Sequence, residues 1–481
     1  MLKDITVTKK LTKTNLDTNR SGNYATKVLL VVTSVALLIN YVETMVIPGI
    51  PTIQNDFSTT STVASWITSA FLIVGAAVSP LFGKLGDIYG KKKILLTILL
   101  LYIVGVGLAG FASNIYMLIA TRALQGVGFA IIPLGIAIIT DVFPKEKVAT
   151  AQGIISATFA IGSTLGLVIG SYIIGNFSWH WGFYTSFVLS IALFFAVAVM
   201  LKKDVPNQKS KVDYTGAVLL TVGIVLVLLY LTEIPSLGWL SLQNIAFLIT
   251  GLVLVTGFSV FESKQTNPLI SINLLKIRNV LVANVVGILS SLIMFLGYIA
   301  VVYYAQSPAP QGLGLGIIET GLVLAPASVA LIVLSPLMGK LVARIGPKHV
   351  LSLGAGITVV GMLMLICFRG TTLDLAVDVT VTFVGVIAMF IPLVNMIAMS
   401  VPPENRAVGL GMNTMLRNIG GAIGPVVATT IIATYTGSIA FNIVYIVGIA
   451  AAIVVVMLSL TVKNYTFKSA PKKHDRCNGC G

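Results

Sequence analysis

The chain has 481 residues, of which 56% are hydrophobic and 10% charged, and its mean hydropathy is +0.98. A soluble globular domain carries roughly 25% charged residues, so this composition excludes one. The net charge of +15 does not indicate nucleic-acid binding, because the basic residues gather in alternate loops between apolar segments.

The apolar segments are about 18 to 25 residues long, the length of a helix that crosses a hydrocarbon core of about 30 Å. Residues 1–27 precede them and are predicted to form a disordered cytoplasmic arm. The sequence therefore predicts an all-α polytopic membrane protein with fourteen spans, at 28–48, 63–82, 94–111, 116–140, 149–174, 182–201, 214–231, 242–261, 280–304, 317–342, 350–368, 375–397, 409–434 and 439–462.

An internal repeat organises these spans. The stretch SPLFGKLGDIYGKKK at 79–93 returns as SPLMGKLVARIGPK at 335–348, and FPKEK at 143–147 matches VPPEN at 401–405, 258 positions later. The repeat predicts two six-helix bundles, 28–201 and 279–462, joined by a linker (202–278) that carries two extra helices.

Basic residues in alternate loops place both termini in the cytoplasm of a multi-pass plasma-membrane protein. The tail, 463–481, contains His474, Cys477 and Cys480. Three ligands on a loose chain end make a poor metal site, so no metal is expected.

The stretch Gly83–Lys93 is predicted to be a short cytoplasmic loop, in which Asp87 stabilises a helix end or pairs with a basic residue. An ordinary basic turn is the alternative. The stretch resembles the signature loop of the major facilitator superfamily. That resemblance implies a conformational latch formed by Asp87, Gly83, Gly90 and Lys91, which the second copy lacks because Ala343 replaces the Asp.

Arg122 lies inside the fourth span, where a charge costs about 2.5 to 3.5 kcal/mol and is expected to face the bundle interior. Snorkelling to the outer interface is the alternative. The sequence around Arg122, Gln125 and Gly126 resembles a superfamily motif whose Arg is implicated in proton transfer.

Glu43 lies deep in the first span, where a carboxyl group can bind and release a proton. The alternative is a Glu at the outer interface. Its surroundings resemble the first-helix motif of the fourteen-helix drug:proton antiporters, in which the tetracycline exporters of Gram-positive bacteria carry a Glu. The resemblance implies that Glu43 and Arg122 couple transport to protons. Val42 stands where the Asp of that motif is usual.

Three glycines at intervals of four, Gly162, Gly166 and Gly170, predict close helix packing in the fifth span. They also resemble an exporter motif, with Leu167 in place of its Pro. By analogy with the superfamily, the substrate cavity is expected at Asn40, Gln125, Tyr298 and Asn395. Asp378 and Arg417 are secondary candidates inside later spans.

The resemblance implies a transporter, and the sequence shows neither a nucleotide-binding motif nor a catalytic constellation that would indicate an enzyme. We expect a monomer in the lipid bilayer that exports amphipathic or cationic small molecules (multidrug efflux), driven by the proton gradient without a cofactor. Its mechanism would be alternating access. A proton symporter importing a small metabolite, and a membrane sensor or scaffold without transport, remain alternatives.

Overall fold

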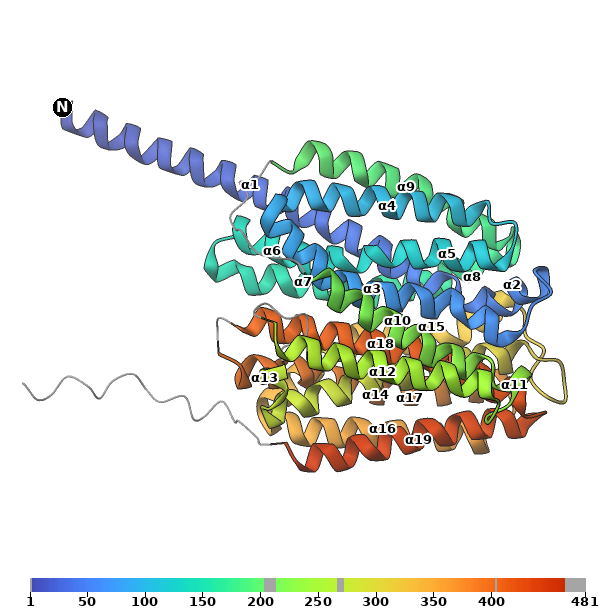
Figure 1. The fold of residues 1–481 in the computed structure, drawn as a ribbon. Coiled ribbons are helices and arrows are strands. Elements are labelled where there is room, and N and C mark those ends of the chain that lie inside the picture. The colour runs from blue at the N-terminus through green and yellow to red at the C-terminus, as the bar shows by residue number, and fades with distance from the viewer. Residues whose placement is uncertain (1, 203–212, 266–271, 403–404, 463–481) are drawn as a thin grey trace, which may run out of the picture.

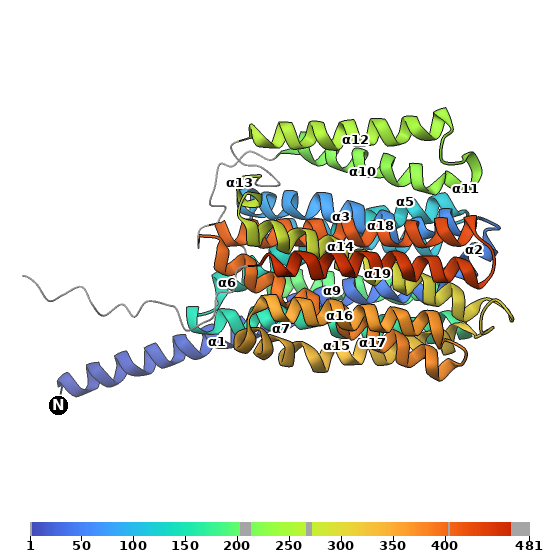
Figure 2. The same ribbon diagram turned by 90° about the horizontal axis from the view of Figure 1, so that it is seen from below.

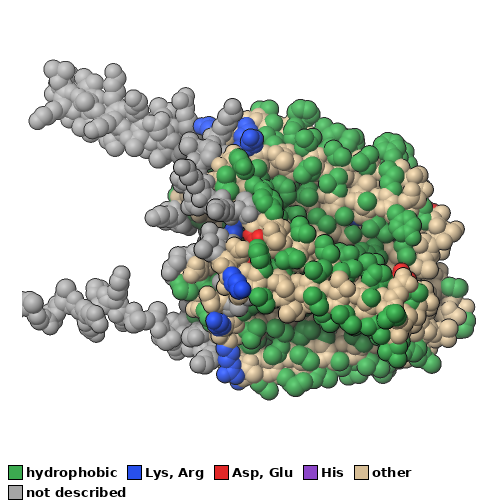
Figure 3. Space-filling view, viewed as in Figure 1, with side chains coloured by type: hydrophobic (Ala, Val, Ile, Leu, Met, Phe, Trp, Pro, Cys, Tyr) green, Lys and Arg blue, Asp and Glu red, His purple; other side chains and the backbone are tan. Residues whose placement is uncertain are grey.

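The computed structural model describes residues 2–202, 213–265, 272–402 and 405–462. Within these ranges, fourteen helical segments are long and apolar enough to cross a membrane, which confirms the predicted polytopic helical fold. The segments form two bundles that lie one above the other in Figure 1. The surface is largely hydrophobic, and Lys and Arg side chains gather at one end (Figure 3).

The first bundle contains six spans, three of which change helix type along their length. It consists of α1 (Leu2–Met45), η1 (Ile47–Gly49), α2 (Ile50–Asp56), α3 (Ser61–Tyr89), α4 (Lys91–Gly110), α5 (Ile115–Gln125), η2 (Gly126–Ala130), α6 (Ile131–Val142), α7 (Lys145–Leu165), η3 (Gly166–Gly170), α8 (Ser171–Asn176) and α9 (Trp179–Met200). The segment η2 is a 3₁₀ turn and η3 a π turn, and both begin at a glycine.

The second bundle contains α14 (Arg278–Gln306), α15 (Ile317–Ile345), α16 (Pro347–Cys367), α17 (Thr372–Ser400), α18 (Arg406–Thr434) and α19 (Ser438–Leu460). Between the bundles in the chain come α10 (Tyr214–Thr232), α11 (Ile234–Leu237), α12 (Leu242–Ser263) and α13 (Ile272–Leu275).

The inserted helices pack on one side of the molecule, where α10 contacts both α3 and α18 (Figure 2). The indole Nε1 of Trp66 in α3 donates a hydrogen bond to Thr232 Oγ1 at 2.9 Å. Thr430 Oγ1 in α18 donates to the Leu231 carbonyl oxygen at 2.9 Å. Helix α10 therefore lies along the junction between the two bundles, and α12 packs on α10.

Two local predictions differ from the structure. The predicted disordered arm is helical, since α1 begins at Leu2. The sequence has neither Pro nor Gly before Gly22 to interrupt this helix. The predicted loop at 83–93 is almost entirely helix: α3 continues to Tyr89 and α4 begins at Lys91. The turn is Gly90 alone, whose φ of 98° favours glycine.

We call the end that carries Lys91, Arg344 and Arg406 the basic end. At the other end the bundles are bonded together. The Tyr303 hydroxyl of α14 donates to Gln54 Oε1 at 2.6 Å, and Gln306 Nε2 donates to the Pro48 carbonyl oxygen at 2.7 Å.

Helices α3 and α18 separate toward the basic end. They touch where Ser69 Oγ donates to the Ala422 carbonyl oxygen at 2.7 Å. Leu72 of α3 also lies at this contact, because a Cβ at Gly421 would lie 3.3 Å from Leu72 Cδ1. Gly83 follows Leu72 by eleven residues and Gly411 precedes Ala422 by eleven, so each glycine continues the contacting face of its helix. At both glycines an added Cβ would meet no atom of the described chain within 4 Å.

Helices α7 and α15 diverge in the same way. A Cβ at Gly321 would lie 2.1 Å from Ser171 Oγ, so α15 and α8 touch there. Gly339 lies eighteen residues beyond Gly321 on α15, five full helical turns toward the basic end, and an added Cβ there would meet no atom of the described chain within 4 Å. The same is true of Gly153, near the basic end of α7. The space between the bundles is therefore open toward the basic end.

This opening predicts opposite effects for two glycines of α18. Gly411→Leu places a side chain in open space and is expected to leave the thermal unfolding temperature of the purified protein unchanged. Gly420→Leu is expected to lower it, because a Cβ there would lie 2.1 Å from the Ile288 carbonyl oxygen, and overpacking costs about 1 to 3 kcal/mol. Equal destabilisation by the two variants would contradict the opening.

Candidate functional site

Glu43 of α1 lies in the buried interior of the first bundle. Its side chain is 2% exposed, and Oε2 has no hydrogen-bond partner. Among the described residues the carboxyl group makes no ion pair within 4 Å. It interacts electrostatically with two guanidinium groups, those of Arg122 and Arg417.

Arg122 of α5 is fully buried and held by its own bundle. Its Nε donates to the Ile67 carbonyl oxygen at 3.0 Å, and its Nη1 donates to the Val42 carbonyl oxygen at 3.3 Å. Nη1 also donates to Gln125 Oε1 at 2.9 Å. The guanidinium lies 4.3 Å from the centre of the Phe71 ring. Arg122 thus faces the bundle interior and ties α5 to α1 and α3.

Arg417 comes from α18 in the other bundle. Its guanidinium lies 4.2 Å from the centre of the Phe390 ring, and Nε is buried without a hydrogen-bond partner. The side chain as a whole is half-buried. The sequence marks Arg417 only as a secondary candidate, because no local pattern shows that it approaches Glu43 across the two bundles.

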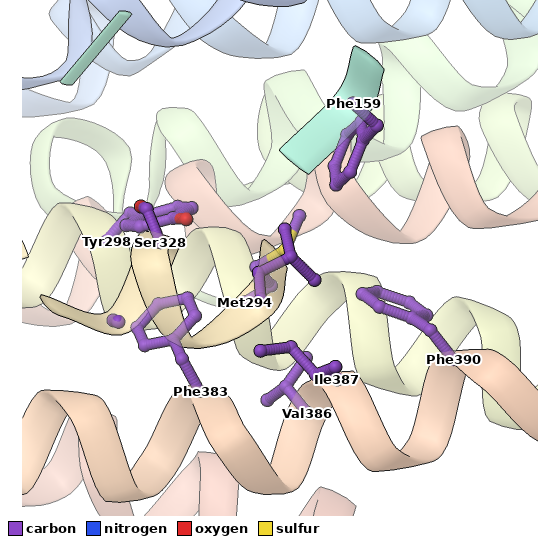
Figure 4. A pocket seen from close by; sticks show the side chains of 10 residues that line it. Phe159, Met294, Tyr298, Ser328, Phe383, Val386, Ile387 and Phe390 are labelled. Atoms are coloured by element: carbon purple, nitrogen blue, oxygen red, sulfur yellow. The ribbon is translucent and has the colours of Figure 1, made fainter. Parts of the chain in front are cut away.

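A pocket lies between the bundles (Figure 4). Its wall is mainly aromatic and aliphatic, formed by Phe159, Met294, Tyr298, Ala327, Ser328, Leu331, Phe383, Val386, Ile387 and Phe390. Phe159 belongs to α7 of the first bundle and faces the others across the gap (Figure 4).

Two lining residues lie close to these charged groups. Tyr298 interacts electrostatically with Glu43 and stacks on Phe383 with ring centres 4.5 Å apart. At the other side, Phe390 carries the guanidinium of Arg417 on its ring. An apolar, aromatic wall therefore lies between an acid of one bundle and a base of the other.

The other residues predicted to line the cavity lie elsewhere. Asn40 is fully buried and donates to the Ala36 carbonyl oxygen at 2.7 Å. Gln125 is also fully buried; it accepts from Arg122 and donates to the Gly105 carbonyl oxygen at 3.0 Å. Asn395 is half-buried on α17 and does not line the described pocket. Of the four, Tyr298 alone lines this pocket.

The three glycines at intervals of four press α7 and η3 against α1. A Cβ at Gly162 would lie 2.8 Å from the Leu37 carbonyl oxygen, and one at Gly170 would lie 2.7 Å from the Met45 Cα. At Gly166 it would lie 2.5 Å from the Tyr41 carbonyl oxygen. This contact fixes the part of α1 that carries Glu43, as the packing prediction requires.

The predicted latch contains an ion pair, but Asp87 is not part of it. Lys91 pairs with Asp141 at the end of α6, fifty residues along the chain. Asp87 is exposed, and within the described chain it makes no ion pair. Sequence reasoning missed Asp141 because it lies outside the motif.

Asp378 lies in the second bundle, away from the pocket. It is 1% exposed on α17, and its Oδ2 has no hydrogen-bond partner. Its electrostatic neighbours are Asp374 and Tyr445, and Tyr445 in turn interacts with Arg369. These groups lie near the ends of α16 and α17 opposite the basic end.

Comparison with known proteins identifies the family. A model of the Major Facilitator Superfamily matches residues 32–425 and 286–476. The chain belongs to this superfamily. Major facilitator proteins are transporters, so the chain is a membrane transporter and not an enzyme.

The relatives of this transporter include multidrug transporters. Multidrug resistance protein 3 of Bacillus subtilis (strain 168) is 26% identical over 422 residues, which cover 86% of this chain and 81% of the relative. The multidrug export protein EmrB of Escherichia coli (strain K12) is 25% identical over 394 residues, which cover 79% of this chain and 75% of EmrB.

Solved structures share the fold at lower identity. An auto-inhibited peptide transporter of the POT family superposes with a TM-score of 0.64 at 14% identity, covering 92% of this chain and 98% of that one. A mutant of the nucleoside transporter NupG gives a TM-score of 0.63 at 12% identity, covering 90% of this chain and 99% of that one.

The bonding of Arg122 predicts that lysine cannot replace it. Arg122→Lys keeps the charge but loses the planar donor group that reaches two carbonyls and Gln125, so buried acceptors are left unpaired at a cost of about 1 to 3 kcal/mol each. We expect a lower thermal unfolding temperature for the purified protein. Arg344→Lys, at an exposed position, is the control and should match the wild type. An unchanged Arg122→Lys variant would contradict the bonding described.

Proposed function

We propose that this transporter is a proton-coupled exporter of amphipathic small molecules at the cell membrane, working by alternating access of its two bundles. One observation carries the proposal: Glu43 interacts with Arg122 of its own bundle and with Arg417 of the other. An ionised carboxylate attracts Arg417 across the gap, and protonation removes that attraction. Proton binding therefore changes the force between the bundles.

Alternating access requires that the proton bind the two states with different affinity. In the state described, the bundles are bonded at one end and open at the basic end. The positive-inside rule assigns the basic end, and both termini, to the cytoplasm. Glu43 and the pocket would then be reached from the cytoplasm, and rocking of the bundles would turn them outward.

The direction of transport rests on the relatives. Multidrug resistance protein 3 and EmrB are named for resistance and export. The proposal needs a monomer and no cofactor beyond the proton gradient.

The test is dye uptake into everted membrane vesicles with an imposed inside-acid gradient. Ethidium and rhodamine 110 serve as amphipathic dyes, with vesicles lacking the protein to subtract passive uptake. We expect gradient-dependent uptake by the wild type and its loss in Glu43→Gln. Glu319→Gln, an exposed carboxyl group at the start of α15, is the matched control and should transport normally.

The alternatives give different results in the same vesicles. A proton symporter would accumulate substrate under the opposite gradient. A sensor or scaffold would show neither gradient-driven uptake nor counterflow of preloaded dye. Uptake that persists unchanged in Glu43→Gln would remove that residue from proton coupling.

If Asp87 forms the latch implied by its motif, it does so when the basic end is closed, because it is exposed and without an ion pair among the described residues in the open state. Asp87→Asn should then leave the thermal unfolding temperature unchanged and reduce the closed population. Spin labels at Ile154 of α7 and Ile345 of α15 would report that population as a short-distance peak. An identical distance distribution would count against the latch.

A further inference from the structure

A carboxyl group in the second bundle is buried without a counter-ion. Asp378 of α17 is 1% exposed, and its Oδ2 has no hydrogen-bond partner. Among the described residues it makes no ion pair. It does not line the pocket between the bundles. An ionised carboxylate without a partner is costly in a membrane interior, so a ligand that removes this charge would stabilise the site.

The two bundles carry buried charged groups at nearly the same depth. Asn114 caps the start of α5, and Thr371 caps the start of α17, 257 positions later. Arg122 lies eight residues after the first cap, and Asp378 lies seven residues after the second, about 10 Å along its helix. Arg122 donates to two carbonyl oxygens and to Gln125. Of these two charged groups, only Arg122 is bonded to the bundle around it.

A buried tyrosine of α19 lies at the level of Asp378. Helix α16 packs against both α17 and α19. Two neighbouring residues of α16 touch these helices, one at Thr382 and the next at Gly448. Asp378 precedes Thr382 by four residues, and Tyr445 precedes Gly448 by three, about one helical turn in each case. Tyr445 is fully buried, and its hydroxyl group also has no hydrogen-bond partner.

The other ionisable groups around Asp378 do not neutralise it. Arg369 is already engaged, because its Nη1 donates to the Leu365 carbonyl oxygen at 2.7 Å and its Nη2 to the Ser438 carbonyl oxygen at 3.2 Å. Arg417 of α18 lies on Phe390, twelve residues further along α17. Toward the end opposite the basic end, the helices packed on α17, and α17 itself, carry Tyr298, Tyr304, Glu319, Cys367, Arg369, Asp374 and Tyr445.

We propose that Asp378 is a second proton-binding site of this chain, separate from Glu43. The bound proton removes the uncompensated charge, and the hydroxyl group of Tyr445 is available as a hydrogen-bond partner. A metal ion fits less well, because the described residues contain no group of three or more His, Cys, Asp or Glu side chains that could hold one. The proposal goes beyond the export function, since it requires neither Glu43 nor transport.

The position of the site gives the proton a structural effect. Helix α17 also carries Phe383 and Phe390, which line the pocket between the bundles. Phe383 follows Asp378 by five residues. Gain or loss of a charge at Asp378 therefore acts on a helix that forms the pocket wall.

The test uses the linkage between proton binding and folding. A folded chain that holds a proton at Asp378, which the unfolded chain releases, becomes less stable as the pH rises. Asn is neutral at every pH, so Asp378→Asn lacks this loss. Thermal unfolding of the purified full-length protein in detergent is measured at about pH 5 and about pH 8. Relative to the wild type, the unfolding temperature of Asp378→Asn should rise by about 2 °C or more between these pH values.

Asp374→Asn is the matched control on the same helix. The carboxylate of Asp374 accepts from Thr371 N at 3.2 Å and Thr371 Oγ1 at 2.7 Å, so it caps α17 as an acceptor. Its unfolding temperature relative to the wild type should not rise between the two pH values. In a Glu43→Gln background, Asp378→Asn should give the same rise as in the wild type, because the two sites are separate.

Three results would overturn the inference. The first is a difference between Asp378→Asn and the wild type that stays constant or falls as the pH rises. The second is an Asp378→Asn protein that does not fold, because a neutral isostere can replace a protonated carboxyl group but not a required charge. The third is loss of the effect in the Glu43→Gln background. Since unfolding needs no transport, these results are independent of dye uptake in vesicles.

Discussion

Charged groups in the membrane interior are costly unless they find partners, and this constraint organises the molecule. Glu43 is almost completely buried and has two cations as neighbours, one in each bundle. Arg122 donates through Nε and Nη1 to backbone carbonyls of α3 and α1, while its Nη2 is buried without a partner. The arrangement makes the electrostatics of the site depend on how the two bundles lie relative to each other. A site of this kind is sensitive both to protonation and to the position of the bundles.

Close helix packing holds the charges in place. In the first bundle, α7 and η3 lie against the backbone of α1 through Gly162, Gly166 and Gly170. In the second, Gly420 and Gly424 bring α18 equally close to α14. These contacts leave little freedom for α1 and α18 to rotate within their bundles. The bundle motion proposed above would therefore take place where α3 meets α18 and α15 meets α7 and α8.

The aromatic pocket lies between the bundles, so their relative motion would change its shape. Phe159 comes from one bundle, and Tyr298, Phe383 and Phe390 come from the other. A ligand there contacts both bundles at once, so its binding energy depends on their separation. Helix α10 lies along the same junction, where its Thr232 and Leu231 are bonded to α3 and α18.

Local properties of the chain were enough to predict the fourteen spans, the duplication, and Glu43 and Arg122 as interior charges. Length and hydropathy identify a span, and a charge within it must face inward. The sequence did not show which uncharged residues, or which residues at helix ends, face the interior of a bundle. The reason is that lipid-exposed and interior side chains of a membrane helix are equally apolar. In the state described, Asn40 and Gln125 are buried and bonded within the first bundle, and Phe159, which lines the pocket, was not recognised from the sequence.

Long-range pairings were also beyond the sequence. Asp141 pairs with Lys91 from another helix, and Arg417 of the other bundle interacts electrostatically with Glu43 without contacting it. These long-range interactions depend on the rotation and position of α1 and α18. Backbone packing at the glycines and the contacts between the bundles set both. No local pattern records that geometry, and it becomes visible only when all the helices are in place.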